Sequence, residues 1–484
     1  MVLVLLGAAT LKAFRDFDIA WDSIAYHLPF AALKTHIVDP ARYELTGMLR
    51  YYYDGFPAFP SYLKGGLWMA LGKPEAPNLV ALLSFFCLPL YVWRVWRLPF
   101  SWTVIALLAI PAVQVSVTRN QIDLPANVFM SVLVLSLCDA AARPLEFGPA
   151  KALVAALAAA MAANFKPQMV VHVGVLAVVA LVLVVMATRR KVQVPLLQSA
   201  RAHPLGAAAA LVLAVPLVFA APLSNWIQRG NPFYPIRVSV LGQTLFPGPL
   251  PPSGLWPEPV YSAHYPQALR WLLSVLEFRA FDSRPIPYTL GNGDVPIGAM
   301  SMRVGGYMGL LVIVAIGLFV LAARARKDRL STTFAVMLGL TGLLSAITPG
   351  SHELRYASYW MICLVLSTFI LVNPDNTLRT VYRLVLAATL AWVISITGAQ
   401  HFLPTGRNFA YYQRTMGITD RLERTVHDGE TVCLDSFPQS AFQYAPEFHP
   451  RFAATHPYKV RVEGYTPGAP GNLSSGSGVC TWLK

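Results

Sequence analysis

The sequence predicts an all-α polytopic membrane protein with about 11 transmembrane helices, interfacial helices and a small external α/β domain at the C-terminal end. Hydrophobic residues make up 55% of the 484 residues and charged residues only 13%, whereas a soluble domain is about one quarter charged. Apolar runs of about 17 to 22 residues also recur along the chain between short basic patches. Runs of this length can cross a bilayer as helices.

The formal net charge of +14 would suit a nucleic-acid partner, but the distribution of Lys and Arg does not. These residues lie mostly in short loops between apolar runs, which is typical of membrane topology rather than of a nucleic-acid groove. We therefore expect membrane lipids, and no nucleic acid, among the partners.

The chain begins with an apolar run over residues 1–14, which lacks the basic start and cleavage site of a signal peptide and is expected to be a first helix. A polar and aromatic external loop follows over 15–75. Within it, residues 58–72 are predicted to form a helix in the membrane interface, where Tyr, Trp and Lys are favoured. Further spans are expected at 76–93, 99–117, 125–141, 149–164, 168–188, 205–223, 303–323, 331–348, 356–372 and 384–401.

Basic residues fall in alternate loops between these spans, so the positive-inside rule assigns those loops to the cytoplasm. The N-terminus is then inside and the C-terminus outside. The same rule puts the loops 15–75 and 224–302 on the external side. The basic residues concerned are Arg94, Arg97, Arg143, Arg189, Arg190, Lys191, Arg324, Arg326, Lys327, Arg329, Arg379 and Arg383.

Two domains are expected, a transmembrane domain over residues 1–402 and a small external domain over 403–484. The external loop 224–302 is rich in Pro and aromatic residues and is too long for a simple connection, so it is predicted to be a lid or binding loop. Hydropathy drops after about residue 403, and the short runs 432–434 and 459–462 have the composition of strands.

The cysteines fall into two groups. Cys87, Cys138 and Cys363 lie inside apolar runs and are expected to be packing residues. Cys433 and Cys480 lie in the polar C-terminal region, and they could form a disulfide if that region is external.

The first candidate site for chemistry is the stretch 18–34, which follows the first apolar run and includes the segment 21–29 (Trp-Asp-Ser-Ile-Ala-Tyr-His-Leu-Pro). It contains Asp22, Tyr26 and His27. A carboxylate placed where a membrane helix emerges must be solvated, paired or functional. Solvation of the helix end is the alternative for Asp18 and Asp22, and interfacial hydrogen bonding is the alternative for His27.

A second acidic site lies at residues 118–125 (Thr-Arg-Asn-Gln-Ile-Asp-Leu-Pro), between two predicted spans. Pro125 suits the first turn of a helix. Asp123 is close to that helix start, where the helix dipole alone would favour a carboxylate. The predicted topology nevertheless places Asp123 on the same side of the membrane as Asp22.

The same external side carries three cations that could bind a phosphate, namely Arg355, Lys166 and Lys64, and also His352. Arginine suits bidentate phosphate contacts better than lysine does. Alternatives stand beside each assignment. Lys166 could mark only a short turn, Lys64 could reach toward the interface, and Arg355 could pair with Glu353 or a phospholipid.

This ordered set of features resembles the GT-C glycosyltransferases, the polytopic enzymes that include protein O-mannosyltransferases and bacterial aminoarabinose transferases. The segment 21–29 is similar to their first-loop motif, and 123–125 (Asp-Leu-Pro) is similar to their second acidic motif. The segments 230–235 (Gly-Asn-Pro-Phe-Tyr-Pro), 305–307 (Gly-Gly-Tyr) and 354–356 (Leu-Arg-Tyr) also resemble parts of such proteins. Together these features cover most of residues 1–400.

The sequence departs from the family pattern at two places. Ser23 follows Asp22 where many relatives carry a second acid, and Phe56 precedes Pro57 where some relatives place a phosphate-binding Lys. The resemblance therefore assigns no metal ligands here, a divalent cation is left open as a cofactor, and the donor-phosphate contacts must come from other cations.

The resemblance implies an inverting glycosyltransferase that moves a sugar from a polyprenyl-phosphate donor to an acceptor hydroxyl on a glycan, lipid or protein. Asp22 is implied as the general base, which a hydroxyl nucleophile needs, and Asp123 as its support. Arg355, Lys166 and Lys64 would stabilise the leaving phosphate. Tyr26, His27 and His352 are candidate substrate contacts.

Two other functions are kept as alternatives. A transporter or lipid flippase also uses charges in a membrane protein, although such charges usually lie near the bilayer midplane. A lipid-linked oligosaccharide polymerase or ligase would share the lipid-linked substrate. For all of these functions the expected location is the cell envelope, in the bacterial inner (plasma) membrane with the active site on the external face.

Overall fold

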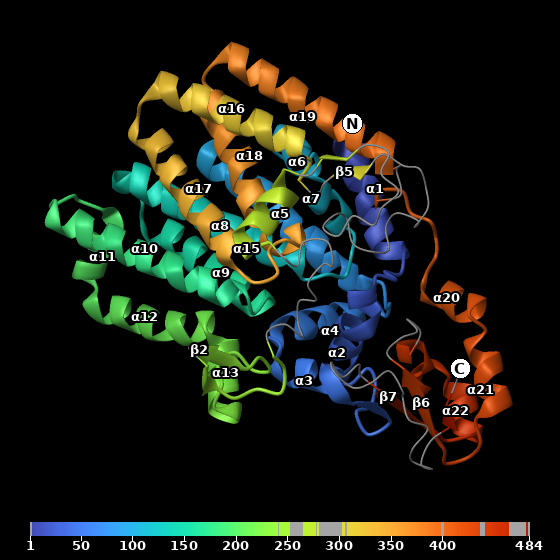
Figure 1. The fold of residues 1–484 in the computed structure, drawn as a ribbon. Coiled ribbons are helices and arrows are strands. Elements are labelled where there is room, and N and C mark those ends of the chain that lie inside the picture. The colour runs from blue at the N-terminus through green and yellow to red at the C-terminus, as the bar shows by residue number, and fades with distance from the viewer. Residues whose placement is uncertain are drawn as a thin grey trace.

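The structure is a computed structural model of the chain. It describes residues 2–240, 242–251, 265–276, 278–279, 303–304, 307–397, 401–435, 441–463 and 481–482. In these residues helices dominate, and they form a bundle that is flanked by the C-terminal region (Figure 1).

Seven helices in the described part of the chain are long and apolar enough to cross a membrane. The multi-pass helical prediction is therefore confirmed. In chain order they are η2 with α5 (Ala76–Trp96), α8 (Asp123–Ala142), α10 (Met169–Arg189), α16 (Gly309–Arg326), α17 (Arg329–Ile347), η4 with α18 (Leu354–Val372) and α19 (Asn376–Thr397).

The predicted number of about 11 spans is not confirmed, because the other predicted spans are short or bent. α1 (Val2–Arg15) and α9 (Pro149–Phe165) have 14 and 17 residues. α11 (Pro195–Ala202) and α12 (Pro204–Val218) meet at 109° and count as an eighth span only if taken together.

The predicted span 99–117 is also interrupted. It consists of α6 (Phe100–Leu108) and α7 (Pro111–Ser116). Pro111 lacks a backbone N–H and disfavours helical conformation at the residue before it. The run is therefore continuous in hydropathy but not in helical structure.

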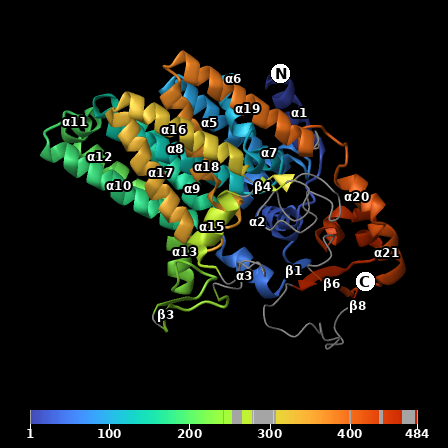
Figure 2. The same cartoon turned by 45° about the horizontal axis from the view of Figure 1, so that its top comes forward.

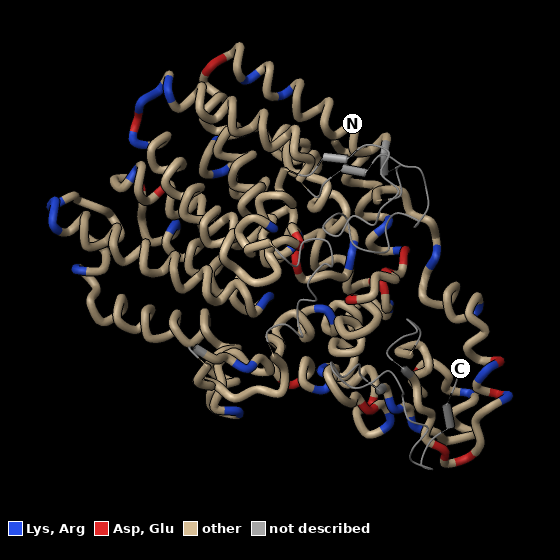
Figure 3. Tube along the Cα trace, in the orientation of Figure 1, with Lys and Arg blue, Asp and Glu red and all other residues tan. Residues whose placement is uncertain are grey.

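The basic turns of the bundle lie away from the C-terminal region. Figure 3 shows Lys and Arg at the turns after α10 and α16, on the opposite side of the bundle from α20 to α22. These turns contain residues 189–191 and 324–329. The arrangement agrees with the alternation on which the topology prediction rests, and which side is external stays a prediction.

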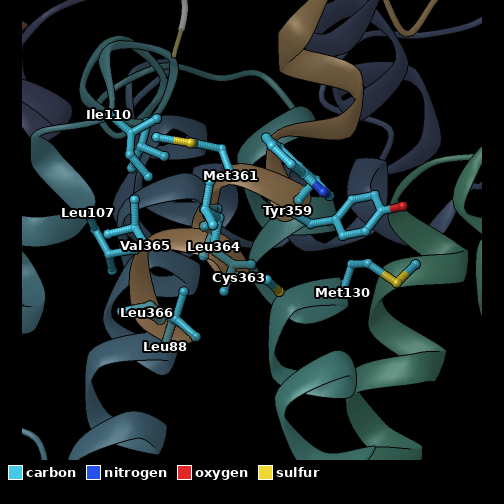
Figure 4. Close-up of a cluster of buried hydrophobic side chains, with 14 of the residues drawn as sticks. Leu88, Leu107, Ile110, Met130, Tyr359, Met361, Cys363, Leu364, Val365 and Leu366 are labelled. Carbon is cyan, nitrogen blue, oxygen red and sulfur yellow. The ribbon is translucent and has the colours of Figure 1, made fainter. Parts of the chain in front are cut away.

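The centre of the bundle is built by α8 and α18, which are buried along most of their lengths. Figure 4 shows part of this core, with Leu88 of α5, Met130 of α8 and Tyr359 to Leu366 of α18 packed together. Burying such side chains contributes about 1.5 to 3 kcal/mol each. Asp123 is the first residue of α8, and Arg355 lies on η4, directly before α18.

The first loop folds over the end of the bundle. It forms α2 (Leu28–Lys34), β1 (Tyr43–Leu45), α3 (Gly47–Gly55) and α4 (Phe59–Leu71). The predicted helix over 58–72 is thus present as α4. Its buried face includes Lys64, Gly65 and Trp68, and its other side leaves Tyr62 and Met69 exposed.

The C-terminal region contains the predicted strands and joins the first loop. Its helices are α20 (Phe409–Thr415), α21 (Ile418–Thr425) and α22 (Pro450–Thr455). The parallel sheet has the order β1-β7-β6-β8, with β6 (Thr431–Asp435), β7 (Lys459–Glu463) and β8 (Thr481–Trp482). Figures 1 and 2 both show these elements beside the first loop.

Strand β1 is the link between the first loop and the C-terminal sheet. Tyr43 lies opposite Val460, and Val432 lies opposite Val460 from the other side. Side chains from both parts of the chain form one hydrophobic cluster.

Cys433 is disulfide-bonded and Cys87, Cys138 and Cys363 are free, whereas Cys480 lies outside the described residues.

The described part of the loop 224–302 packs against the first loop through α13 (Ala220–Arg229) and the segment that follows it. The other elements there are β2 (Val238–Val240), β3 (Gln243–Phe246), α15 (Gln267–Val275) and β4 (Phe278–Arg279), which pairs with β5 (Arg303–Val304). The Asn225 amide donates to the carbonyls of Gly55 and Tyr234 at 2.9 and 3.2 Å. The motif 230–235 therefore holds this segment against α3, and a Cβ on Gly55 would lie 2.7 Å from Tyr234 and Pro235.

Replacing Gly65 by Ala is expected to destabilise the protein, because a Cβ there would lie 2.4 Å from the side chain of Thr35 and 2.9 Å from the carbonyl oxygen of Ala31. Overpacking of this kind costs about 1 to 3 kcal/mol. Gly66→Ala is the matched control, since nothing lies within 4 Å of its Cβ position and Ala favours a helix. Thermal unfolding in detergent compares the two, and an equal midpoint would contradict the close contact between α2 and α4.

Candidate active site

Four charged side chains predicted as site residues come together at one end of the bundle. Asp22 immediately precedes the π-helical turn Ser23–His27, and Asp123 is the first residue of α8. Lys166 follows α9, and Arg355 lies on the short helix Leu354–Ala357 before α18. π-helical turns are rare and are frequent at functional sites.

Arg355 lies between the two candidate carboxylates. One guanidinium nitrogen, Nη1, contacts Asp22 Oδ2 and lies 3.8 Å from Asp123 Oδ2. Its Nε donates to Glu353 Oε2 at 3.0 Å. The alternative pairing of Arg355 with Glu353 is thus present, and it occurs together with the contact to Asp22.

Asp123 also forms a buried ion pair with Lys166. Lys166 Nζ contacts Asp123 Oδ1, and each side chain is only 5% exposed. The Lys166 ammonium lies 3.5 Å from the centroid of the Tyr356 ring. Burial lowers the pKa of Lys166, and the adjacent Asp123 carboxylate opposes that shift. Lys166 thus does more than mark the turn between α9 and α10.

Two neutral side chains fix the backbone of the site. Asn127 Nδ2 donates to the carbonyl oxygens of Asp123 and Arg355 at 2.7 and 2.8 Å, and its Oδ1 accepts from Tyr359 N at 2.8 Å. The Tyr307 hydroxyl donates to Leu354 O at 3.0 Å. Tyr307 and the segment 354–356, which both belong to the motifs described above, are therefore in direct contact.

The sequence interpretation missed Asn127, although a signal was present. It is an amide within a mostly apolar span, and a polar side chain within a membrane helix usually has a partner or a function.

Lys64 points into the protein from α4 and does not reach outward. Its side chain is 1% exposed, and Nζ donates to Asn120 O at 2.5 Å. Burial lowers the pKa of Lys64 to about 7, although Asp18, Asp123 and Asp22 act in the opposite direction. Lys64 is therefore a second buried cation close to the carboxylates.

The candidate substrate contacts differ in their surroundings. The rings of Tyr26 and His27 lie 4.4 Å apart between their centroids, and Tyr26 packs edge-on against Trp21 and Phe56. Burial lowers the pKa of His27 well below its ordinary value, and Lys64 and Arg355 contribute to the shift. His27 is consequently neutral near pH 7. His352 is a buried side chain on the turn before Arg355.

The side chains of the cluster are not equally accessible to solvent. Arg355 and Glu353 are 26% and 28% exposed, and Asp22 is 13% exposed, whereas Asp123 and Lys166 are each 5% exposed. Arg355 and Asp22 are therefore more accessible to solvent than Asp123 and Lys166.

Within the described ranges, no three or more His, Cys, Asp and Glu side chains are grouped as a metal site requires. Asp22 and Asp123 are instead paired with Arg355 and Lys166.

The sequence matches no known protein family, and no curated protein matches it. The likeness to GT-C glycosyltransferases consequently depends on the motifs in the sequence alone, and the functional conclusions are proposals.

Proposed function

We propose that the protein is a membrane glycosyltransferase of the GT-C type, which transfers a sugar from a polyprenyl-phosphate donor to an acceptor hydroxyl. The observation that carries the proposal is the arrangement of Asp22, Arg355 and Asp123. A partly exposed carboxylate is paired with a partly exposed guanidinium, and a buried second carboxylate lies 3.8 Å from that guanidinium.

The reaction is a displacement at the anomeric carbon of the donor sugar. The acceptor oxygen forms a bond to that carbon, and the bond from the carbon to the phosphate oxygen breaks. Asp22 takes the proton from the acceptor hydroxyl, which makes the oxygen a better nucleophile. The products are the glycosylated acceptor, with inverted configuration, and polyprenyl phosphate.

The cations have a separate task, which is to stabilise the negative charge that accumulates on the leaving phosphate. Arg355 is the most accessible of the three candidates and can contact a phosphate through two nitrogens. When the donor phosphate binds Arg355, it replaces Asp22 as a partner, and the Asp22 carboxylate is released to act as the base. Lys166 holds Asp123 in place, and Lys64 adds positive potential from within.

The position of the charges favours this proposal over a transporter. Asp123 opens its membrane helix, and Asp22, Lys166 and Arg355 lie in loops or short helices next to helix ends. A transporter site would be expected near the middle of discontinuous helices. An oligosaccharide polymerase or ligase shares the chemistry and differs in the size of the transferred group.

The test uses the purified protein in proteoliposomes with polyprenyl-phosphate monosaccharides. We expect an acceptor-dependent release of polyprenyl phosphate with transfer of one sugar. Transfer only from lipid-linked oligosaccharides would support the polymerase or ligase alternative. Movement of the lipid across the bilayer without bond cleavage would overturn the proposal in favour of a flippase.

Lys64 should give the reaction a pH dependence near neutrality. Its pKa of about 7 means that the ammonium loses its proton as pH rises above 7, and the attraction for the donor phosphate falls with it. We expect kcat/KM for the donor to decrease as pH rises through about 7 and to level off at the value of the enzyme with neutral Lys64. Lys64→Arg stays charged at every relevant pH and should lose this decrease. Identical profiles for the two proteins between pH 6 and 9 would contradict the assignment.

A further inference from the structure

Asp18 is an acidic residue outside the set assigned above, and its carboxylate is the centre of a polar network. Oδ1 accepts a hydrogen bond from Ala20 N at 3.1 Å. Oδ2 accepts from the Ser23 hydroxyl at 2.5 Å and from Asn120 N at 2.8 Å. One side chain thus binds its own turn and a loop that lies 102 residues further along the chain.

The network continues through the peptide group of Asn120. The carbonyl oxygen of Asn120 accepts from Lys64 Nζ, while its N–H donates to Asp18. Asn120 is fully buried. Asp18 and Lys64 therefore hold this residue from both sides, and they connect the turn around residue 20, the helix α4 and the loop that precedes α8.

Both ends of the network are next to the candidate catalytic acids. Ser23 directly follows Asp22, and Asn120 lies three residues before Asp123. Asp16, only two residues from Asp18, shows the contrast. Its carboxylate accepts from Thr405 N and Gly406 N and so ties α1 to the C-terminal region, away from both acids.

We propose that Asp18 is a positioning residue that fixes Asp22 relative to Asp123. This inference rests on the proposed function. A carboxylate is suited to the task because it accepts several hydrogen bonds at once, and bonds to an ionised acceptor are short and strong. Since Asp18 contacts residues beside the acids, its effect on the reaction passes through the geometry of Asp22.

The first test compares Asp18→Asn with the matched control Asp39→Asn. An amide has one acceptor oxygen, so Asp18→Asn loses part of the network. Asp39 also accepts a local backbone N–H, from Ala41 at 2.9 Å, but in an exposed turn. We expect Asp18→Asn to lower kcat by roughly tenfold to a hundredfold, as misplacement of a reacting group does, with the donor KM unchanged. Asp39→Asn should behave as the wild type.

A double-mutant cycle separates positioning from a general loss of structure. If Asp18 acts through Asp22, adding Asp18→Asn to Asp22→Asn should lower kcat by less than about twofold, because the group it positions is already absent. If the double variant instead loses kcat by the product of the two single-variant factors, the inference is overturned. Ser23→Ala removes only one of the bonds to Asp18, and it replaces Asp18→Asn in the cycle if that variant does not fold.

The outcomes also distinguish this inference from the proposed function. An unimpaired Asp22→Asn would remove the proposed base, whatever Asp18 does. A strongly impaired Asp22→Asn together with unimpaired Asp18→Asn and Ser23→Ala would leave the glycosyltransferase proposal in place and overturn only the positioning role of Asp18.

Discussion

Replacing Asp22 by Asn is expected to lower the kcat of sugar transfer by about a hundredfold to ten-thousandfold, the usual cost of losing a general base. The amide keeps the shape of the side chain and can still accept a hydrogen bond from Arg355, but it cannot take a proton from the acceptor. Transfer is measured in membranes that contain each variant at matched amounts, over a range of donor and acceptor concentrations.

Asp54→Asn is the matched control for Asp22→Asn. The Asp54 carboxylate also pairs with an arginine, Arg229 Nη2 at 3.2 Å, and its exposure of 16% is close to the 13% of Asp22. Asp54 lies on α3, outside the cluster. We therefore expect transfer by Asp54→Asn at the wild-type rate. If Asp22→Asn also transfers sugar at that rate, the carboxylate of Asp22 is not the general base, and its ion pair with Arg355 is structural.

Much of the fold could be predicted because membrane spans depend mainly on length and hydropathy. α8, α10 and α18 are examples in which an apolar run is also a continuous helix. The span over 99–117 shows the limit, since apolar residues lie on both sides of Pro111 while the helix is broken there. Hydropathy indicates which segments can lie in the bilayer, but backbone geometry determines whether such a segment is one continuous helix.

The pairing of β1 with the C-terminal sheet could not be predicted from the sequence. β1 has only three residues, and Tyr43 pairs with Val460. A strand of this length has almost no periodic signal, and parallel pairing leaves no turn between the two strands to mark it. The hydrophobic contacts that hold β1 exist only after both parts of the chain are folded.

The residues of the candidate site were easier to predict than their partners. Polar residues at the ends of apolar runs identified Asp22, Asp123, Lys166 and Arg355. Their pairing spans 333 residues for Arg355 with Asp22 and 43 for Lys166 with Asp123. Such pairing depends on which helices pack together, and helix packing leaves no local pattern in the sequence.

Lys64 illustrates a second limit. Its helix was predicted, but a single lysine in an aromatic helix fits either an outward or an inward orientation. The close packing of Gly65 against Thr35 and Ala31 turns this side of α4 inward, and this contact is visible only in three dimensions.

Replacing Lys166 by Met should have the largest effect on stability. It leaves Asp123 as a buried carboxylate without its closest cation, and breaking a buried ion pair in this way typically costs 3 to 5 kcal/mol, so we expect a loss of about 3 kcal/mol or more. Lys73→Met is the control. The Lys73 side chain is exposed, and its ammonium lies over the ring of Phe14. A cation–π contact at an exposed site contributes only about 0.5 to 1 kcal/mol. Denaturant titration in mixed micelles gives the free energy of unfolding.

The double variant Asp123→Asn with Lys166→Met separates stability from catalysis. Removing both charges avoids the unpaired carboxylate, and replacement of a whole buried pair is often neutral. We therefore expect most of the lost stability to return while sugar transfer stays impaired, since Asp123 no longer offers a charge to Arg355. If the free energy of unfolding of Lys166→Met lies within about 1 kcal/mol of that of the wild type, Arg355 alone compensates the charge of Asp123. The ion pair between Asp123 of α8 and Lys166 after α9 would then have no role in holding the site together.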